Sequence, residues 1–413
     1  MRLRGGMLYD EGKFSRADLT VGVSASSEEY DIKDLIILPG LADVHVHLRE
    51  PGFSYKETVL SGTKSAAKGG FTSVCAMPNL KPVPDNPQAL KTQLEIISKS
   101  AVVRVHPFGA ITVGEKGEEL SDMRGMAYGV VGYSDDGKGV QNSALMEEAM
   151  LISKNLGKVI SAHCEDESLI AAGWSVNAGH KAEEWGLIGN DAESEYRQIA
   201  RDIELVAKTG AEYHVCHISA AQSVSLIREA KKSGLPVTCE TAPHYLCFTD
   251  DQLKDEGRFK MNPPIRTGKD RDALLEGICD GTIDVIATDH APHSAEEKSG
   301  GLRGSLNGVV GLETSFGAVY KSLVLGGYIK LERLTELMSV NARRIFRLGD
   351  YKELMDYTVV DINREWKVES DKFYSKGKAT PFDGTMLTGL PVMTIVGGKA
   401  VYRDERYFAS SKK

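Results

Sequence analysis

The chain reads Leu41-Ala-Asp-Val-His-Val-His-Leu-Arg-Glu-Pro-Gly52 directly after a short apolar run. Residues 41–48 predict a buried strand, and the Pro-Gly pair indicates a turn into a loop. Side chains two positions apart on a strand point to the same side. We therefore expect His45 and His47 to face one side together, as half of a metal site. Arg49 is next in that row, where its guanidinium can hold a carboxylate through two parallel hydrogen bonds.

Short apolar runs alternate with amphipathic helical patterns from this strand onward. The eight strand candidates are 41–48, Thr72–Met77, Val102–Ala110, Gly129–Tyr133, Val159–His163, Glu212–His217, Val237–Thr241 and Asp284–Asp289. Eightfold alternation of strand and helix over about 250 residues is what a (β/α)8 barrel requires. A doubly wound open sheet would need a glycine-rich phosphate turn after an early strand, and none is obvious.

Both ends of the chain differ from this middle part, because short strand-like pieces there are separated by polar turns. We expect an α/β fold in which a (β/α)8 TIM-type barrel spans residues 41–348. The segments 1–40 and 349–413 are expected to pair into one small β domain beside the barrel.

The composition limits the partners and the compartment. Of the 413 residues, 41% are hydrophobic and 26% are charged, which is typical of a globular protein, and the net charge is −8. With no long basic run, this charge argues against nucleic acid or an anionic membrane as partner. The six cysteines form no CxxC pair, and no apolar stretch is long enough to span a bilayer. We therefore expect a cytoplasmic protein.

Polar side chains gather where the predicted strands end, which is where barrel enzymes carry their chemistry. The residues at these positions are His45, His47, Asn79, Asp135, Asp136, His163, His217, Asp289, His290 and His293. Each alone could be a packed histidine or a solvated acid, but their gathering at one barrel mouth predicts a metal site.

The set supplies ligands for two metal ions. We expect His45, His47 and Asp289 on one ion, His163 and His217 on the other, and Asp136 as the bridge between them. Asp135 is the near competitor for the bridge. Imidazole and carboxylate ligands suit zinc, and a hydroxide between two zinc ions is a nucleophile at neutral pH. Asp289 can take the proton of that nucleophile and return it to the leaving nitrogen.

Substrate contacts are predicted at Arg49, Asn79, Asn262 and His293. An arginine with amide and imidazole groups suits a small ligand that has a carboxylate and amide edges. For the two asparagines, turn chemistry beside proline is an equal alternative. Residues 294–304 have the glycines and charges of a mobile lid. Of the other histidines, His106 and His214 are expected to be structural, His180 solvated, His244 a neighbour of the ligands, and His290 on the opposite face.

Several motifs also match a known family. They are Asp43-Val-His-Val-His-Leu-Arg-Glu-Pro-Gly52, Met77-Pro-Asn79, Ser134-Asp-Asp-Gly137, His163-Cys-Glu165, His217-Ile-Ser219, Asn262-Pro-Pro-Ile-Arg266, Ala287-Thr-Asp-His-Ala-Pro-His293 and Thr380-Pro-Phe-Asp383. Over nearly its whole length the sequence resembles the dihydroorotases of the amidohydrolase superfamily, in particular the bacterial type with an aspartate metal bridge.

The resemblance implies a fold, a reaction and a site. The fold would be a (β/α)8 barrel with a small β-sandwich formed by both chain ends. The reaction would be the reversible cyclisation of N-carbamoyl-L-aspartate to L-dihydroorotate in pyrimidine synthesis. The implied metal ligands are His45, His47, Asp136, His163, His217 and Asp289, holding two zinc ions bridged by Asp136 and a hydroxide. The implied substrate contacts are His47, Arg49, Asn79, Asn262, His293 and the backbone at Asn307 and Gly308. A homodimer and an association with aspartate carbamoyltransferase are expected by analogy.

Two departures from related patterns bear on the alternatives. Many superfamily members bridge their metals with a carboxylated lysine on the fourth strand, and Gly129–Tyr133 contains no lysine. This favours a dihydroorotase over a hydantoinase or dihydropyrimidinase. The loop reads Ser305-Leu-Asn-Gly308 where the family often has Pro-Phe-Gly. A non-catalytic barrel that scaffolds aspartate carbamoyltransferase is the other alternative, and the complete ligand set argues against it.

Overall fold

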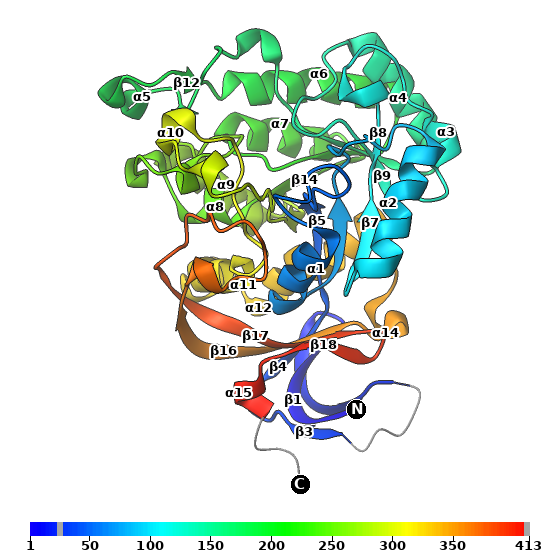
Figure 1. Ribbon diagram of the computed structural model, residues 1–413, viewed down its shortest axis with the longest axis vertical. Helices are drawn as coiled ribbons and strands as arrows, with labels where there is room; N and C mark the ends of the chain where they lie inside the picture. Colours follow the sequence, from blue (N-terminus) through cyan, green and yellow to red (C-terminus); the bar gives the residue numbers. More distant parts are fainter. Residues whose placement is uncertain (23–27, 409–413) are drawn as a thin grey trace.

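The protein is described here by a computed structural model that covers residues 1–22 and 28–408. Parallel strands form its centre and helices surround them, while the two ends of the chain lie together at one end of the molecule (Figure 1). The central strands are β5 (Leu41–Val46), β6 (Phe71–Ala76), β7 (Arg104–Pro107), β8 (Gly109–Ala110), β9 (Gly132–Ser134), β10 (Val159–Ala162), β13 (Tyr213–Val215), β14 (Val237–Thr241) and β15 (Val285–Ile286). The α/β fold expected from the sequence is confirmed.

The central strands follow one another around the molecule in chain order. The first ladder is β5-β6-β7 and the second is β8-β9-β10-β13-β14-β15, with all pairs parallel. One residue, Phe108, separates β7 from β8. After β15 a parallel bridge joins His290 to Val46 of β5, and the His47 amide donates to the His290 carbonyl at 2.8 Å. The pairing therefore returns to its start, in the order that a (β/α)8 barrel requires.

Each predicted strand overlaps a strand of the structure, but most boundaries differ by one to three residues. Two of these differences have a clear cause. The first strand ends at Val46 rather than Leu48, because the chain turns at Arg49, which has a φ of 58°. The fourth begins at Gly132 rather than Gly129, since only Gly132 and Tyr133 pair with β10.

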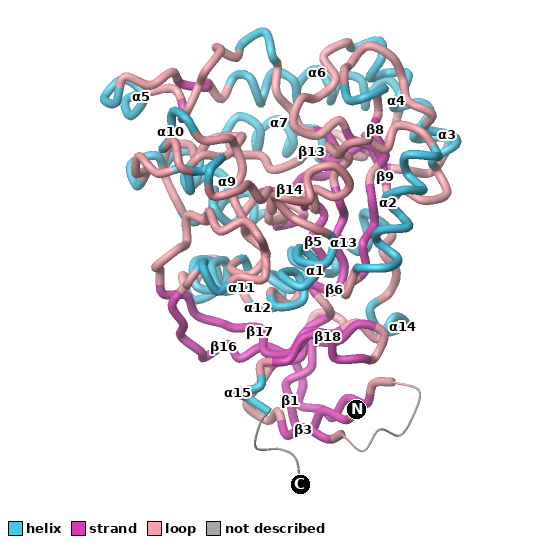
Figure 2. Tube along the Cα trace, viewed as in Figure 1, coloured by secondary structure: helices cyan, strands magenta, loops and turns pink. Residues whose placement is uncertain are grey.

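Helices connect the central strands and cover their outer side (Figure 2). They are α1 (Val59–Lys68), α2 (Pro87–Ser100), α3 (Met123–Met126), α4 (Ser143–Asn155), α5 (His180–Trp185), α6 (Glu193–Thr209), α7 (Ala221–Lys232), α8 (Pro243–Cys247), α9 (Gly268–Asp280), α10 (Gly301–Gly304), α11 (Ser315–Val319), α12 (Leu331–Thr335), α13 (Asn341–Phe346), α14 (Tyr351–Leu354) and α15 (Glu405–Phe408). Local sequence fixes several starts: the Asn86 side chain accepts from two amides of α2, whose first residue is proline.

The chain ends pair in one seven-stranded sheet. Its strands are β1 (Arg2–Asp10), β2 (Lys13–Thr20), β3 (Glu29–Asp31), β4 (Ile36–Pro39), β16 (Tyr357–Lys367), β17 (Met386–Val396) and β18 (Lys399–Arg403). The two ends meet where β4 pairs with β16, and their apolar side chains share one core that includes Leu3, Ile37, Val359 and Val392. This meeting of the ends was expected. The exact domain limits at residues 40 and 348 stay a prediction, and residues 23–27 and 409–413 lie outside the described part.

The end sheet packs on the central unit through α1 and α11, both of which contact β17. Within residues 1–22 and 28–408 we find no helix with the length and apolarity that a bilayer crossing needs.

Candidate metal centre

The two histidines of the opening motif lie at the end of β5. His45 is within the strand, fully buried, and His47 follows directly after the strand ends. The row of alternating side chains does not extend to Arg49, because the backbone leaves the extended region there. The Arg49 Nε instead donates to the carbonyl of Pro292 at 3.3 Å.

Asp136 lies in the middle of the histidines. Its Oδ1 is 3.2 Å from His45 Nε2, 3.8 Å from His217 Nε2 and 3.9 Å from His163 Nδ1, and its Oδ2 is 3.4 Å from His47 Nε2. A carboxylate that reaches all four imidazoles has the position that a bridging ligand requires. The structure therefore brings together the residues that the sequence analysis grouped.

Asp135 does not face the histidines. Its Oδ1 accepts hydrogen bonds from the amides of Ile111 and Thr112 at 2.7 and 3.0 Å, and its Oδ2 accepts from the Thr112 hydroxyl. These bonds tie the segment after β9 to the segment after β8, so Asp135 fixes the backbone from which Asp136 projects.

Asp289 completes the cluster from the other side. Its Oδ1 is 3.3 Å from His47 Nε2 and 3.6 Å from His45 Nε2. Within 4.8 Å of one another lie ligand atoms of His45, His47 and Asp289, and likewise those of Asp136, His163 and His217. These two groups contain the residues that the sequence predicts for the two half-sites.

Buried atoms without partners test whether a metal fits here. Among the described residues, neither His45 Nε2 nor Asp136 Oδ1 has a hydrogen-bond partner. The opposite nitrogen of His45, Nδ1, is 2.7 Å from the Glu240 carboxylate, which can only accept, so the proton is on Nδ1. In the neutral imidazole the lone pair of Nε2 therefore faces Asp136 Oδ1 at 3.2 Å, and a cation between the two atoms would satisfy both. The donor set of imidazoles and carboxylates fits zinc.

Glu240 is a contributor that the sequence analysis missed. Its carboxylate, on β14 and fully buried, accepts from His45 through Oε1, while Oε2 is 3.2 Å from His214 Nε2. The pattern of a carboxylate behind a metal-binding histidine orients the ring and sets its tautomer. The sequence feature that could have indicated this role is an acidic residue within a predicted strand. His214, expected to be structural, supports this carboxylate.

Cys216 is a second unexpected neighbour. Its sulfur lies within 4.8 Å of ligand atoms of His45 and Asp136, and it is 3.1 Å from the Ser161 hydroxyl. Burial raises the pKa of the thiol to about 12, which keeps it protonated.

Neighbouring histidines keep the carboxylates of Asp136 and Glu240 ionised. Burial on its own would raise the pKa of Asp136, but the surrounding His45, His217 and His47 bring that pKa well below its usual value. Burial likewise opposes ionisation of Glu240, yet the charge of His45 and the bonds from His214 and His45 lower the pKa to about 2. Burial and the nearby Arg49 lower the pKa of His47, which favours the neutral, metal-binding imidazole.

Three site residues have a left-handed backbone. The φ values are 58° at Arg49, 33° at His217 and 46° at Asp289. Residues other than glycine rarely adopt this region, and such strain is concentrated at functional sites.

The predicted substrate contacts lie around the cluster, each with a partner in the protein. The amide oxygen of Asn79 is 2.9 Å from His47 Nδ1, so Asn79 also orients a candidate ligand. The Asn262 amide nitrogen is 2.9 Å from Glu165 Oε2 and 3.4 Å from His163 Nε2. The Asn262 Oδ1 is buried without a hydrogen-bond partner in the described part of the chain.

The segment after α10 contacts His293 through its backbone. The His293 Nε2 atom is 2.7 Å from the Asn307 carbonyl oxygen. Gly308 has a φ of 130°, and a Cβ there would lie 2.7 Å from the Ala291 carbonyl, so only glycine fits. This close approach places the Asn307–Gly308 backbone beside His293.

The segment 294–304 is folded and tied down. Glu297 accepts from Tyr55 at 3.1 Å and pairs with Lys56 at 2.9 Å. The Lys298 ammonium, 8% exposed, donates to the carbonyls of Lys260, Leu306 and Gly308 at 2.7–2.9 Å. The sequence analysis did not single out these anchors, because their partners lie in other segments. Mobility of this lid stays a prediction.

None of the remaining histidines belongs to a candidate ligand group of the described residues, although Asp289 and His217 act electrostatically on His244. The His290 Nε2 faces buried Glu57 at 3.4 Å. His244 packs edge-on against Tyr245 at 4.2 Å, and burial lowers its pKa to about 4. His180 is solvated, with 86% of its side chain exposed.

Solved structures with the same fold include an L-hydantoinase (dihydropyrimidinase) from Arthrobacter aurescens and a D-hydantoinase from a Bacillus species. The first has a TM-score of 0.83 at 25% sequence identity, covering 97% of this chain and 96% of that one. The second has a TM-score of 0.83 at 22% identity, covering 98% and 95%. Fold and site together are those of the metal-dependent amidohydrolases.

Comparison with known sequences identifies the family within this class. The family described as dihydro-orotase-like matches residues 34–223. A dihydroorotase of Fusobacterium nucleatum subsp. nucleatum is 49% identical over 98% of this chain and 99% of its own length. A dihydroorotase of Staphylococcus epidermidis is 44% identical over 97% and 96%. The chain belongs to the dihydroorotase family, whose members are cyclic amide hydrolases.

Proposed function

We propose that this chain catalyses the reversible interconversion of N-carbamoyl-L-aspartate and L-dihydroorotate in pyrimidine synthesis. The observation that carries the proposal is the position of Asp136 among four histidines and beside Asp289, in a chain related to dihydroorotases over its full length. A site with an aspartate at this place and an arginine at its edge suits a substrate that has both an amide carbonyl and a carboxylate.

We propose zinc as the metal, with two ions per chain. His45, His47 and Asp289 would hold one ion, His163 and His217 the other, and Asp136 would contact both. When bound, zinc polarises the amide carbonyl and lowers the pKa of water, so that a nucleophile is available at neutral pH. The unpartnered His45 Nε2 and Asp136 Oδ1 support this assignment.

Asp289 is the proposed acid and base. In ring opening, water adds to the ring carbonyl carbon and the bond between that carbon and the ring nitrogen breaks. The Asp289 carboxylate accepts a proton from the attacking water and delivers it to the departing nitrogen. Cyclisation is the reverse, and water leaves. The ionised state of Asp289 suits the first step: burial opposes it, but the hydrogen bond from His47 and nearby His45 lower its pKa.

The surrounding groups position the substrate. The Arg49 guanidinium would pair with the substrate carboxylate, and Asn262 would use its unpartnered Oδ1 to accept from an amide N–H. His293 and the backbone at Asn307 and Gly308 would contact the opposite edge of the ring. Asn79, which bonds His47, would act on the substrate and on a ligand together.

Three further expectations belong to this proposal: a cytoplasmic location, a homodimer, and an association with aspartate carbamoyltransferase. All three rest on analogy with the family. Light scattering of the purified protein, alone and with the carbamoyltransferase of the same source, would test the last two.

The deciding experiment assays ring opening and cyclisation on purified protein, with metal content measured on the same sample. We expect activity with zinc bound, and a loss of at least about 10³-fold in kcat for Asp289→Asn at a largely retained zinc content. Hydantoin and dihydrouracil are assayed beside dihydroorotate. A higher kcat/KM for either would point to a hydantoinase or dihydropyrimidinase. Protein with neither metal nor activity would support the scaffold alternative.

A further inference from the structure

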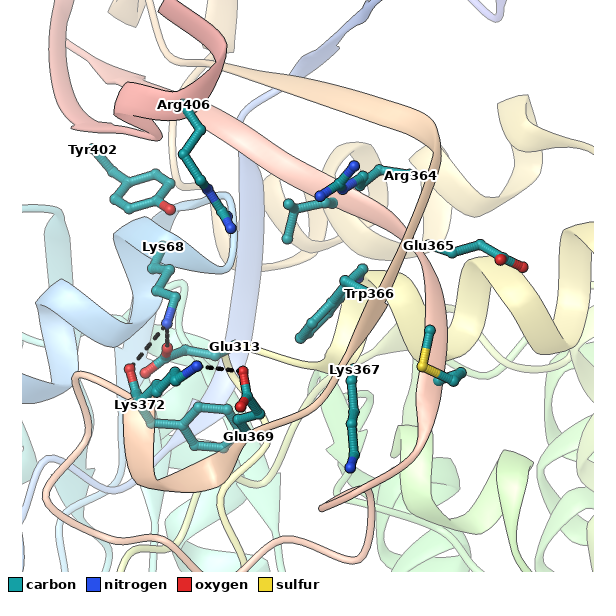
Figure 3. A pocket seen from close by; sticks show the side chains of 13 residues that line it. Lys68, Glu313, Arg364, Glu365, Trp366, Lys367, Glu369, Lys372, Tyr402 and Arg406 are labelled. Atoms are coloured by element: carbon teal, nitrogen blue, oxygen red, sulfur yellow. Dashed lines mark hydrogen bonds and ion pairs between the residues drawn. The ribbon is translucent and has the colours of Figure 1, made fainter. Parts of the chain in front are cut away.

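A cavity that shares no residue with the metal centre lies against the end sheet, next to α1 (Figure 3). Its volume is about 400 Å³, which is in the range of small-molecule sites. The lining residues come from α1, β16, β17, β18, α15, the loop after β16 and the loop before α11. Neither the family motifs nor the proposed reaction uses any of them.

The floor of this cavity is apolar and aromatic. It contains Phe373 and Leu390, both 9% exposed, and the indole of Trp366. The Trp366 Nε1 donates to the Gly389 carbonyl at 3.1 Å, so its ring is held in place. A flat face of this kind suits a ring that stacks on it.

The rim carries positive charge. Lys68 and Lys372 are neutralised by Glu313 and Glu369, at 2.7 and 2.6 Å. The Arg364 guanidinium, in contrast, has no hydrogen bond or ion pair with any residue of the described ranges, and its charge helps to lower the pKa of Asp404.

The Arg406 guanidinium donates three hydrogen bonds to the Asp404 carboxylate, of 2.9, 3.2 and 2.6 Å. Figure 3 shows the guanidinium groups of Arg364 and Arg406 on the same side of the Trp366 ring, whereas Glu365 points away. The Tyr402 hydroxyl, beside Arg406 in this view, also has no hydrogen-bond partner among residues 1–22 and 28–408.

An aromatic floor below two guanidinium groups fits one ligand class. Guanidinium groups bind phosphate through paired hydrogen bonds, and a free hydroxyl adds a further polar contact. The stacking surface requires a flat ring in the same molecule. We propose that this cavity binds a nucleoside monophosphate, with the base on Trp366 and the phosphate between Arg364 and Arg406.

The test measures binding to the full-length, zinc-loaded protein by isothermal titration calorimetry. The probes are AMP, UMP, inorganic phosphate, adenosine and uridine. We expect at least one monophosphate to bind at least tenfold more tightly than both phosphate and the corresponding nucleoside. Saturating dihydroorotate should leave that affinity unchanged, because the cavity is separate from the metal centre.

Two variants locate the site. Arg364→Gln should weaken monophosphate binding at least tenfold and leave nucleoside binding unchanged. Trp366→Leu should weaken monophosphate binding and leave phosphate binding unchanged. The matched control is Arg344→Gln, which removes an exposed arginine on α13 that does not line the cavity.

Each other outcome overturns the proposal. No monophosphate binding at about 5 mM ligand would do so, as would equal affinity for phosphate and nucleotide, which is non-specific anion binding. Displacement by dihydroorotate would place the nucleotide at the metal centre instead. An equal loss in Arg344→Gln would show a general charge effect. Because binding is measured, failure here is distinct from failure of the proposed reaction.

Discussion

The Nδ1 atom of His45 lies 2.7 Å from Oε1 of Glu240, so a buried acid on β14 sets the tautomer of a candidate metal ligand on β5. The residues are 195 positions apart in the chain. The same carboxylate is within 3.3 Å of the His217 amide. One side chain thus fixes a candidate ligand from each proposed half-site.

Replacement of Glu240 by glutamine should weaken metal binding. The amide keeps the shape but loses the charge that favours an Nδ1 proton on His45, and outer partners of this kind change metal affinity by about 10–100-fold. The measurement is zinc affinity against a competing chelator. Glu212→Gln, an exposed acid at the start of the preceding strand, is the control and should bind zinc as the wild type does. Unchanged affinity in Glu240→Gln would show that the Glu240 carboxylate does not support the ligand.

Removal of metal should lower the melting temperature. Without a metal ion, His45 Nε2 and Asp136 Oδ1 lie 3.2 Å apart in a buried site, and neither atom has a hydrogen-bond partner among the described residues. A metal that binds only the folded state stabilises it by about 4 kcal/mol at a thousandfold excess over its dissociation constant. Calorimetry after chelation and after return of zinc measures this difference.

Asp136→Asn is the comparison for this experiment. The neutral amide can donate to His45 and relieves the buried charge, so chelation should lower its melting temperature by less than in the wild type. An equal drop in both proteins would place the metal elsewhere.

The fold could be predicted because each central strand is a short apolar run between helical patterns, and this is a local signal. The position of Arg49 could not be predicted. Strand alternation holds only while the chain is extended, and the left-handed φ at Arg49 ends it. The sequence also did not decide between Asp135 and Asp136. Both residues follow the end of β9, where strand alternation no longer predicts the direction of a side chain.

The residues that support the candidate ligands and the lid could not be predicted for a different reason. Glu240 and Lys298 act through partners in other segments, and a single sequence does not show which distant segments meet. The candidate metal ligands could be proposed because the predicted fold class brings the carboxyl ends of its parallel strands together.

Lys298 should be a positioning residue for substrate. Its ammonium joins the carbonyls of Lys260 and Gly308, next to the proposed contacts Asn262 and Asn307. We expect Lys298→Met to raise KM for dihydroorotate about tenfold with a smaller change in kcat, because binding geometry is lost while the metal centre is intact. Lys298→Arg, which keeps the donors, should recover part of the affinity.

The matched control for this series is Lys254→Met, an exposed lysine on a neighbouring loop. It should leave both constants unchanged. If Lys298→Met lowered kcat and left KM unchanged, the Lys298 contacts would have to act on the chemical step rather than on binding.

His106 should make the protein less stable in acid. Burial, together with Arg343 and Arg104, lowers its pKa from an ordinary value near 6.5 to about 4. The folded state therefore binds this proton less readily than the unfolded state does. Its contribution is fully present above pH 6.5 and is lost as the pH falls toward 4. Between pH 7.5 and pH 5 the loss from this one group is about 2 kcal/mol.

Urea unfolding at these two pH values, with chelator in every sample, measures the loss. His106→Gln has no group to protonate, so its stability should fall by about 2 kcal/mol less than that of the wild type. His180→Gln removes an exposed histidine and should follow the wild type. If His106→Gln and wild type lost the same stability, the acid sensitivity would have to come from other buried groups, of which His244, with a pKa also near 4, is the first to replace.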